Sequence, residues 1–282
     1  VTLVEVANLP ERAAHARLYE LFSTADPRFD ALVKVDADME LVEPRLLAAL
    51  GSLFRRHPDL DHIIVGVDDW FSGRRIQEMN AWRNGVRWTT PPPELFTDLP
   101  DNTVRTKLKI TEIGRPLVLH AADPSDLQAV RYGLHRGLKA VATGKPSRIL
   151  RLREVVDHAI EAPERGRLVA VASIGLALRN RAQARSLLEA TLAEEADLTA
   201  VLVELGDPGL CTGILQAVGA LAGGAQHATA SRNSTARNSS LMRRALKVAC
   251  ARLPPQHERH RESGRPNPEE IGREFLALLE TD

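Results

Sequence analysis

Apolar and polar positions alternate along the first 120 residues in a way that predicts strands and helices in turn. Short apolar runs rich in β-branched residues indicate strands, whereas apolar residues spaced three and four apart indicate amphipathic helices. The expected order is strand 1–6, helix 11–23, strand 32–35, helix 41–56 and strand 62–67. Because strands that alternate with helices favour right-handed crossovers, the pattern predicts an α/β fold with a mainly parallel, Rossmann-like sheet.

The pattern changes after a further strand expected at 116–119. Asp123-Pro124-Ser125-Asp126 is typical of a helix start, and this helix is expected to end near residue 142, before Gly144. Further helices are expected over 151–162, 167–179, 182–195 and 240–252. Two polar segments, 223–240 and 254–268, are expected to be mobile. The sequence therefore predicts a first domain over 1–145 and a helical C-terminal region over 146–282.

Composition argues against several classes of function. Basic and acidic residues number 37 each, so net charge does not indicate binding to nucleic acid or to a membrane surface. No apolar run reaches the roughly 18 residues that a membrane span needs. Cys211 and Cys250 lack a metal-binding spacing, which favours reduced thiols and a cytoplasmic location. The chain opens inside the strand expected at 1–6, without a secretory signal, which indicates missing upstream sequence or an unusual start.

The candidate chemistry begins where the apolar strand 32–35 ends in two carboxylates, Asp36 and Asp38. Residues i and i+2 of an extended segment point to the same side, so both carboxylates are expected to converge on one Mg²⁺ or Mn²⁺ ion. The alternative is that Asp38 and Glu40 cap the helix expected at 41–56. A second such triplet, Asp59-Leu60-Asp61, lies in a polar turn and is expected to be a solvated loop.

Two later strands also end in polar side chains. His120 follows the strand at 116–119 and offers an imidazole as a third metal ligand, the alternative being a histidine that hydrogen-bonds a loop. Asp68 and Asp69 follow the strand at 62–67, where a carboxylate suits a general base and Trp70 suits stacking on a sugar. The alternative for this segment is a turn with a packed tryptophan. Ligands of open α/β sheets bind at the carboxyl ends of strands, where these side chains are expected to meet.

Two helices carry weaker candidates. His15 and Arg17 lie on the helix before the aspartate pair, and their side chains are long enough to contact the phosphate or the base of a nucleotide. A solvent-exposed helix face is the commoner outcome for such residues. On the helix expected at 124–142, Gln128, Tyr132 and His135 share one face. This face suits phosphate, but an ordinary exposed face is the expected alternative.

Several segments of the first 145 residues resemble bacterial glycosyltransferases of the family 2 type, which have the GT-A fold. The segments that carry the resemblance are Asn8-Leu9-Pro10, Ala14-His15-Ala16-Arg17-Leu18-Tyr19, Lys34-Val35-Asp36-Ala37-Asp38-Met39, Val67-Asp68-Asp69-Trp70-Phe71-Ser72-Gly73, His120-Ala121-Ala122-Asp123-Pro124-Ser125-Asp126-Leu127-Gln128-Ala129 and Gly133-Leu134-His135-Arg136. The similarity extends more loosely to about residue 200. The family's first strand–helix unit, on the order of 30 residues and part of the base pocket, has no counterpart before Val1.

The resemblance implies a set of roles for the candidate residues. Asp36, Asp38 and His120 would hold Mn²⁺ or Mg²⁺, and Asp68 or Asp69 would act as the base of an inverting enzyme. The resemblance also implies a nucleotide-sugar donor, which would contact residues of the N-terminal segment and of the metal-binding segment. These donor-binding candidates are Asn8, His15, Arg17, Asp36 and Asp38. Trp70 would contact the acceptor.

The leading hypothesis is therefore a metal-dependent, hexosyltransferase-like glycosyltransferase that moves a sugar from a nucleotide-sugar donor to a glycan or another hydroxyl acceptor. One alternative is an inactive GT-A-like module for binding or assembly, and the helical region is a candidate surface for self-association. A second alternative is a nucleotidyltransferase, which usually has a Gly-rich phosphate loop near the N-terminus that this chain lacks.

Overall fold

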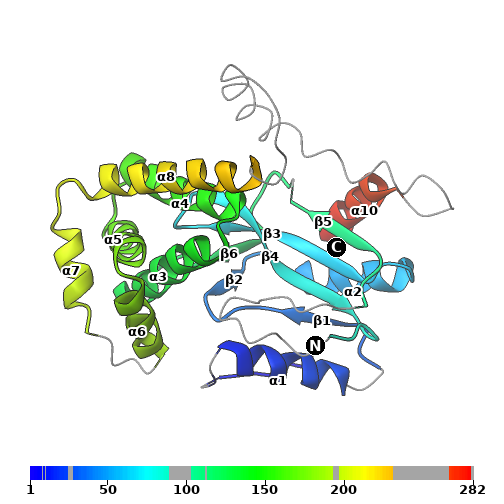
Figure 1. Cartoon of the computed structure of the whole chain (residues 1–282). Coiled ribbons are helices and arrows are strands. Elements are labelled where there is room, and N and C mark those ends of the chain that lie inside the picture. The colour runs from blue at the N-terminus through cyan, green and yellow to red at the C-terminus, as the bar shows by residue number, and fades with distance from the viewer. Residues whose placement is uncertain are drawn as a thin grey trace.

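The computed structural model describes residues 1–7, 9, 11–24, 28–88, 103–111, 113–192, 197–230 and 267–280. The chain forms a mixed sheet flanked by α1, α2 and α10, with the helices α3 to α8 grouped on one side of it (Figure 1). The strands are β1 (Ala31–Lys34), β2 (Met39–Leu41), β3 (His62–Asp69), β4 (Arg74–Arg83), β5 (Lys107–Ile110) and β6 (Val118–His120). The helices are α1 (Glu11–Ser23), α2 (Leu46–Arg56), α3 (Asp126–Thr143), α4 (Pro146–Glu161), α5 (Arg165–Arg179), α6 (Arg181–Leu192), α7 (Thr199–Leu205), α8 (Leu210–Ala230) and α10 (Pro268–Glu280).

The sheet is mixed, so the expectation of a mainly parallel sheet was wrong. Its strand order is β1-β4-β3-β6-β2, with β5 also paired to β3. The β3–β5 and β3–β6 pairs are parallel, whereas β1–β4, β3–β4 and β2–β6 are antiparallel. The reason is a tight turn after β3, closed by Gly73 at φ +60°, which sends the chain straight back as β4 instead of into a crossover helix.

The helices α1 to α6 occur close to where the sequence predicts them, whereas α7, α8 and α10 were not among the expected helices, and the helix expected at 240–252 lies outside the described residues. Helix α3 begins at the cap Ser125, which accepts the amide hydrogen of Gln128, and ends at Gly144 in the left-handed conformation. Residues 1–6 form no strand and are largely exposed. Helix α2 begins at Leu46, because residues 39–41 extend as β2 and pair with β6. The strands β4 and β5 were not expected.

Two apolar clusters form the core, and both cross the expected domain boundary at residue 145. The first packs the sheet against α2 and takes in Ile271, Phe275 and Leu279 of α10. The second joins α3 to the later helices and takes in Phe71 and Ala121 from the sheet side. Helix α3 therefore packs with the helical group, while α10 returns to the sheet.

The C-terminal region is only partly described. Residues 223–230 continue α8, so this part of the first segment expected to be mobile is helical. Residues 231–266, with Cys250 and most of the second such segment, lie outside the described residues. Among the described helices none is both long and apolar enough to cross a membrane alone, although α7 and the first part of α8 pass that test together as a pair bent by 96°.

Candidate functional site

Three polar side chains meet where β2, β3 and β6 lie side by side. The register pairs His120, the last residue of β6, with Met39 on one side and Asp69 on the other. Asp38 directly precedes Met39 and therefore enters the same edge of the sheet. The sequence predicted that Asp36, Asp38, Asp68, Asp69 and His120 would meet at the carboxyl ends of strands. The structure brings Asp38, Asp69 and His120 together, but Asp38 lies at the start of β2 and not at the end of β1.

The imidazole of His120 lies between two carboxylates. Its Nδ1 is 2.7 Å from Asp69 Oδ1, and its Nε2 is 3.2 Å from Asp38 Oδ2. Burial alone would lower the pKa of His120, but the hydrogen bonds and charges of Asp38 and Asp69 raise that pKa to about 10. In the structure as described, His120 is therefore an imidazolium that donates a hydrogen bond from each ring nitrogen.

Asp69 is a buried carboxylate whose acceptor sites are already occupied. The residue is 2% exposed. Its Oδ1 accepts from His120, and its Oδ2 accepts from the Ser72 amide at 3.0 Å, the Ser72 hydroxyl and the Tyr132 hydroxyl at 3.0 Å. Burial would raise the pKa of Asp69, but the bond and charge of His120, the Ser72 bond and the charge of Arg136 hold that pKa below its usual value.

Asp38 is the member of the group that reaches solvent. Its side chain is 34% exposed, whereas that of Asp69 is fully covered. Burial would raise the pKa of Asp38, but hydrogen bonds from His120 and Gln128 and the charge of His120 lower it. Asp38 is therefore bonded to His120 and Gln128 and keeps about a third of its side chain open to solvent.

The backbone next to His120 is strained. Ala121 has a φ of 53°, in the left-handed region that a side chain disfavours, by roughly 1–2 kcal/mol. Its amide donates to the Asp38 carbonyl at 2.7 Å. Strained residues of this kind gather at functional sites, where the surrounding structure holds them in place.

Asp38 and His120 can hold a divalent cation only after His120 loses its Nε2 proton, because Nε2 and Asp38 Oδ2 form an ion pair in this structure. Two ligands bound at about 2.1 Å and a right angle lie about 3 Å apart, close to the 3.2 Å between Asp38 Oδ2 and His120 Nε2. A carboxylate and a neutral imidazole suit Mn²⁺, and a metal-bound histidine usually donates its other ring hydrogen to a carboxylate, as His120 does to Asp69. Among the described residues no three such groups gather around one point, so the pair would need ligands from substrate or water.

Asp36 does not join this pair. The extended geometry expected for Asp36 and Asp38 was wrong, because the Met39 amide bonds the Asp36 carbonyl at 3.0 Å and closes a turn. The Asp36 carboxylate instead forms an ion pair with Lys34. The capping alternative is also wrong, because α2 starts at Leu46 and its first turn has no side-chain cap.

The two carboxylates expected to include the base are both engaged. Asp68 forms a two-pronged ion pair with Arg75, with nitrogen–oxygen distances of 2.7 and 2.8 Å. Asp69 faces inward and is saturated with donors, as described above. The Trp70 ring lies 4.2 Å from the guanidinium of Arg167, which covers one of its faces, so at most the other face is open to a sugar.

The donor-binding candidates of α1 lie elsewhere. The His15 ring is 6.3 Å from that of Tyr19, in an aromatic cluster that packs on Trp82 of β4, and Arg17 is exposed and paired with Glu20 at 2.7 Å. Trp82 is paired in register with His62, seven residues and therefore about 23 Å of strand from Asp69. Asn8 lies outside the described residues.

The sequence did not predict that helix α3, which follows His120, contributes side chains to this group. The face of α3 with Gln128 and Tyr132 was expected to be exposed, but Tyr132 is 9% exposed and bonds Asp69, while Gln128 bonds Asp38. The spacing of four residues was the available signal. Ser72 had no such signal. Asp61 of the second triplet is buried and accepts the amides of residues 105 and 106, so it is not solvated as expected.

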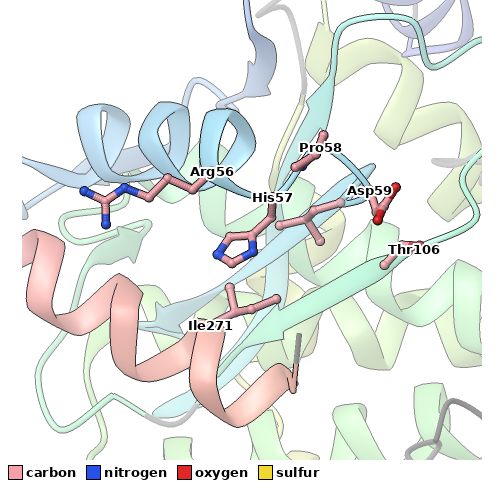
Figure 2. Close-up of a pocket in the computed structure, with 7 residues that line it drawn as sticks. Arg56, His57, Pro58, Asp59, Thr106 and Ile271 are labelled. Atoms are coloured by element: carbon pink, nitrogen blue, oxygen red, sulfur yellow. The ribbon is translucent and has the colours of Figure 1, made fainter. Parts of the chain in front are cut away.

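Two cavities lie away from this group. One, of about 150 Å³, opens between the end of α2 and α10, where His57 points toward Ile271 (Figure 2). The other, of about 440 Å³, is polar and lies by the turn after β4, around Asn84 and Gly85. Both border the loop that leads into the start of β3, at the end of that strand opposite Asp69. Neither therefore adjoins the Asp38–His120 pair.

Comparison with protein-family models, curated proteins and solved structures gives no match for this chain. The geometry of the side chains is therefore what supports a function.

Proposed function

We propose that this chain is a metal-dependent glycosyltransferase of the GT-A type, in which Asp38 and His120 hold Mn²⁺ or Mg²⁺ against the diphosphate of a nucleotide sugar. The observation that carries the proposal is the 3.2 Å approach of Asp38 Oδ2 to His120 Nε2, with Asp69 bonded to the other ring nitrogen. This arrangement supports a two-ligand cation site that is completed by phosphate oxygens.

Each residue of the group has a distinct task in this proposal. A bound cation supplies electrostatic stabilisation of the charge that develops on a leaving diphosphate. Asp38 provides the solvent-facing carboxylate ligand. To act as a ligand, His120 would release its Nε2 proton to solvent and keep its Nδ1 hydrogen on Asp69, which would fix the ring orientation. Asp36, directed to Lys34, is not part of the proposed ligand set.

A second candidate function is a diphosphate-binding module without transferase activity. It is favoured by the engagement of both predicted base residues, Asp68 with Arg75 and Asp69 with His120. Neither carboxylate is placed to take a proton from an acceptor hydroxyl. The two candidate functions share the cation site and differ only in whether sugar is transferred.

The cation site is tested by calorimetric titration of Mn²⁺, with and without UDP or GDP, into the wild-type chain and the Asp38→Asn variant. The substitution keeps the shape but removes the charged ligand, and we expect Mn²⁺ affinity to fall by at least about a hundredfold. Asp36→Asn is the matched control two residues away. Because Asp36 is tied to Lys34, we expect it to change affinity by less than about threefold.

Equal Mn²⁺ affinity in the wild type and Asp38→Asn would remove the proposal, and so would a larger loss in Asp36→Asn. Hydrolysis of UDP-sugars and GDP-sugars in the presence of Mn²⁺ separates the two candidate functions. A transferase slowly hydrolyses its donor in the absence of acceptor, whereas a binding module leaves every donor intact.

A further inference from the structure

Tyr132 connects helix α3 to the group at the strand ends. Its hydroxyl donates to Asp69 Oδ2 at 3.0 Å. Its ring stacks on Phe71 at 4.0 Å between centroids and lies 5.1 Å from the guanidinium of Arg136. A residue packed on its ring and bonded through its hydroxyl has little freedom, so the hydroxyl is held in a fixed place relative to Asp69.

The orientation of Asp69 depends on the donors that reach Oδ2. One carboxylate oxygen faces His120, and the other receives the Ser72 amide, the Ser72 hydroxyl and the Tyr132 hydroxyl. Ser72 belongs to the turn after β3, so without Tyr132 every donor to Oδ2 would come from within three residues of Asp69 itself. Tyr132 adds a hydrogen bond from α3 to this carboxylate, beside the charge of Arg136 on the same helix.

We propose that Tyr132 is a positioning residue for the Asp38–His120 cation site and acts through Asp69 on the ring of His120. This inference rests on the proposed function, because it concerns the affinity of the same site. Asp69 sets the plane of the imidazole, and the imidazole plane sets where Nε2 points relative to Asp38. One turn earlier on α3, Gln128 bonds Asp38, so the helix reaches both sides of the pair.

Tyr132→Phe removes the hydroxyl and keeps the ring in place, which makes it the sharpest test. We expect the dissociation constant for Mn²⁺, measured by calorimetry on the full chain, to rise about tenfold, as is typical when a residue behind a metal ligand is removed. The matched control is Tyr19→Phe, because Tyr19 is the other tyrosine of the sequence and lies in the aromatic cluster of α1. We expect that control to change the constant by less than about twofold.

The melting temperature without added metal is measured for both variants, because a purely structural role would lower it and leave Mn²⁺ affinity unchanged. If the wild type itself binds no Mn²⁺, the proposed function fails, and this inference fails with it. If the wild type binds but Tyr132→Phe binds equally well, only the positioning role of Tyr132 is overturned. Equal weakening in both tyrosine variants would overturn that role as well.

A second variant keeps the inference testable if Tyr132→Phe does not fold. Ser72→Ala removes the other hydroxyl that bonds Asp69 Oδ2, without touching the packing of α3. The inference requires that it also weaken Mn²⁺ binding severalfold. Unchanged binding in Ser72→Ala would show that the donors to Asp69 Oδ2 do not control the site.

Discussion

Two buried histidines, one near each end of β3, have opposite electrostatic properties. His62 begins β3 and is 1% exposed, and His120 lies beside Asp69, the last residue of β3, and is 6% exposed. Yet the pKa of His62 is lowered to about 4, whereas that of His120 is raised to about 10. Similar burial therefore leaves one ring neutral and the other charged at neutral pH.

The partners of the two rings explain the difference. His62 loses solvent and has one neutral acceptor, Asn80 at 2.9 Å, while its ring stacks on Trp82 and Lys107 repels its charged form. His120 loses solvent too, but two carboxylates bond it and reverse the effect of burial. Charged partners therefore decide the protonation state of a buried histidine, and the end of β3 that carries Asp69 is where such partners lie.

The largest expected stability effect comes from breaking this arrangement at its buried carboxylate. Asp69→Ala removes the Nδ1 partner of His120 and the acceptor of the Ser72 and Tyr132 hydrogen bonds, and we expect a loss of about 3–5 kcal/mol in the free energy of unfolding. The neighbouring Asp68→Ala breaks a partly exposed ion pair and should cost about 1 kcal/mol or less. Urea unfolding measures both, and equal losses would contradict the contrast.

The two histidines should also give stability opposite dependences on pH. Because the pKa of folded His120 lies above the unfolded value of about 6.5, its stabilising contribution is complete below pH 6.5 and is lost as pH rises toward 10. Because the pKa of folded His62 lies below that value, its contribution is complete above pH 6.5 and is lost as pH falls toward 4.

Non-titrating variants isolate these two contributions in urea unfolding between pH 5 and pH 9.5. The stability advantage of the wild type over His120→Gln should shrink by a few kcal/mol as pH rises above 6.5. Relative to His62→Phe, the wild type should instead lose stability as pH falls below 6.5. Parallel curves for either pair would refute the assignment of its charge state.

The smallest expected effect concerns Glu274, the carboxylate bonded to a third histidine, His57. His57 Nε2 lies 2.6 Å from Glu274 of α10, which also pairs with Arg56 at 2.9 Å, and the group is partly exposed. Burial would raise the pKa of Glu274, but the bonds and charges of His57 and Arg56 lower it, so its contribution is present above about pH 4.5 and lost in acid. Glu274→Gln should cost up to about 1 kcal/mol at pH 7.

Hydrogen exchange of the α10 amides reports this change directly, since loss of the ion pairs should speed opening of that helix. Glu270→Gln, an exposed change in the first turn of α10, is the control and should have a smaller effect. If the two variants exchange alike, the His57–Glu274 pair does not hold α10 in place.

The sequence predicted the elements that local rules control. Helix α3 carries its start and stop signals in Ser125 and Gly144, so its limits were predictable. The hairpin of β3 and β4 was missed for two reasons. The turn 70–73 contains only one glycine and no typical hairpin pair, and β4 carries many polar residues, which weakens the strand signal. Helix α10 was missed because its apolar face is short and is stabilised by contacts with α2 and the sheet.

For the candidate site, the sequence by itself determined that Asp69 and His120 end apolar runs, and these runs are the parallel strands β3 and β6, whose ends share an edge. Asp38 joins them for a reason that the sequence did not show: it precedes β2, which pairs with β6, and it does not end a strand that neighbours β3. Only the tertiary structure decided which of these carboxylates are not already engaged by other side chains. A turn directs Asp36 to Lys34, Arg75 occupies Asp68, and Tyr132 of a distant helix fixes Asp69. Hydrogen bonds and ion pairs weaken when the distance between their atoms changes by a few tenths of an ångström. Packing, and not local sequence, sets the distances between segments that are far apart in the chain.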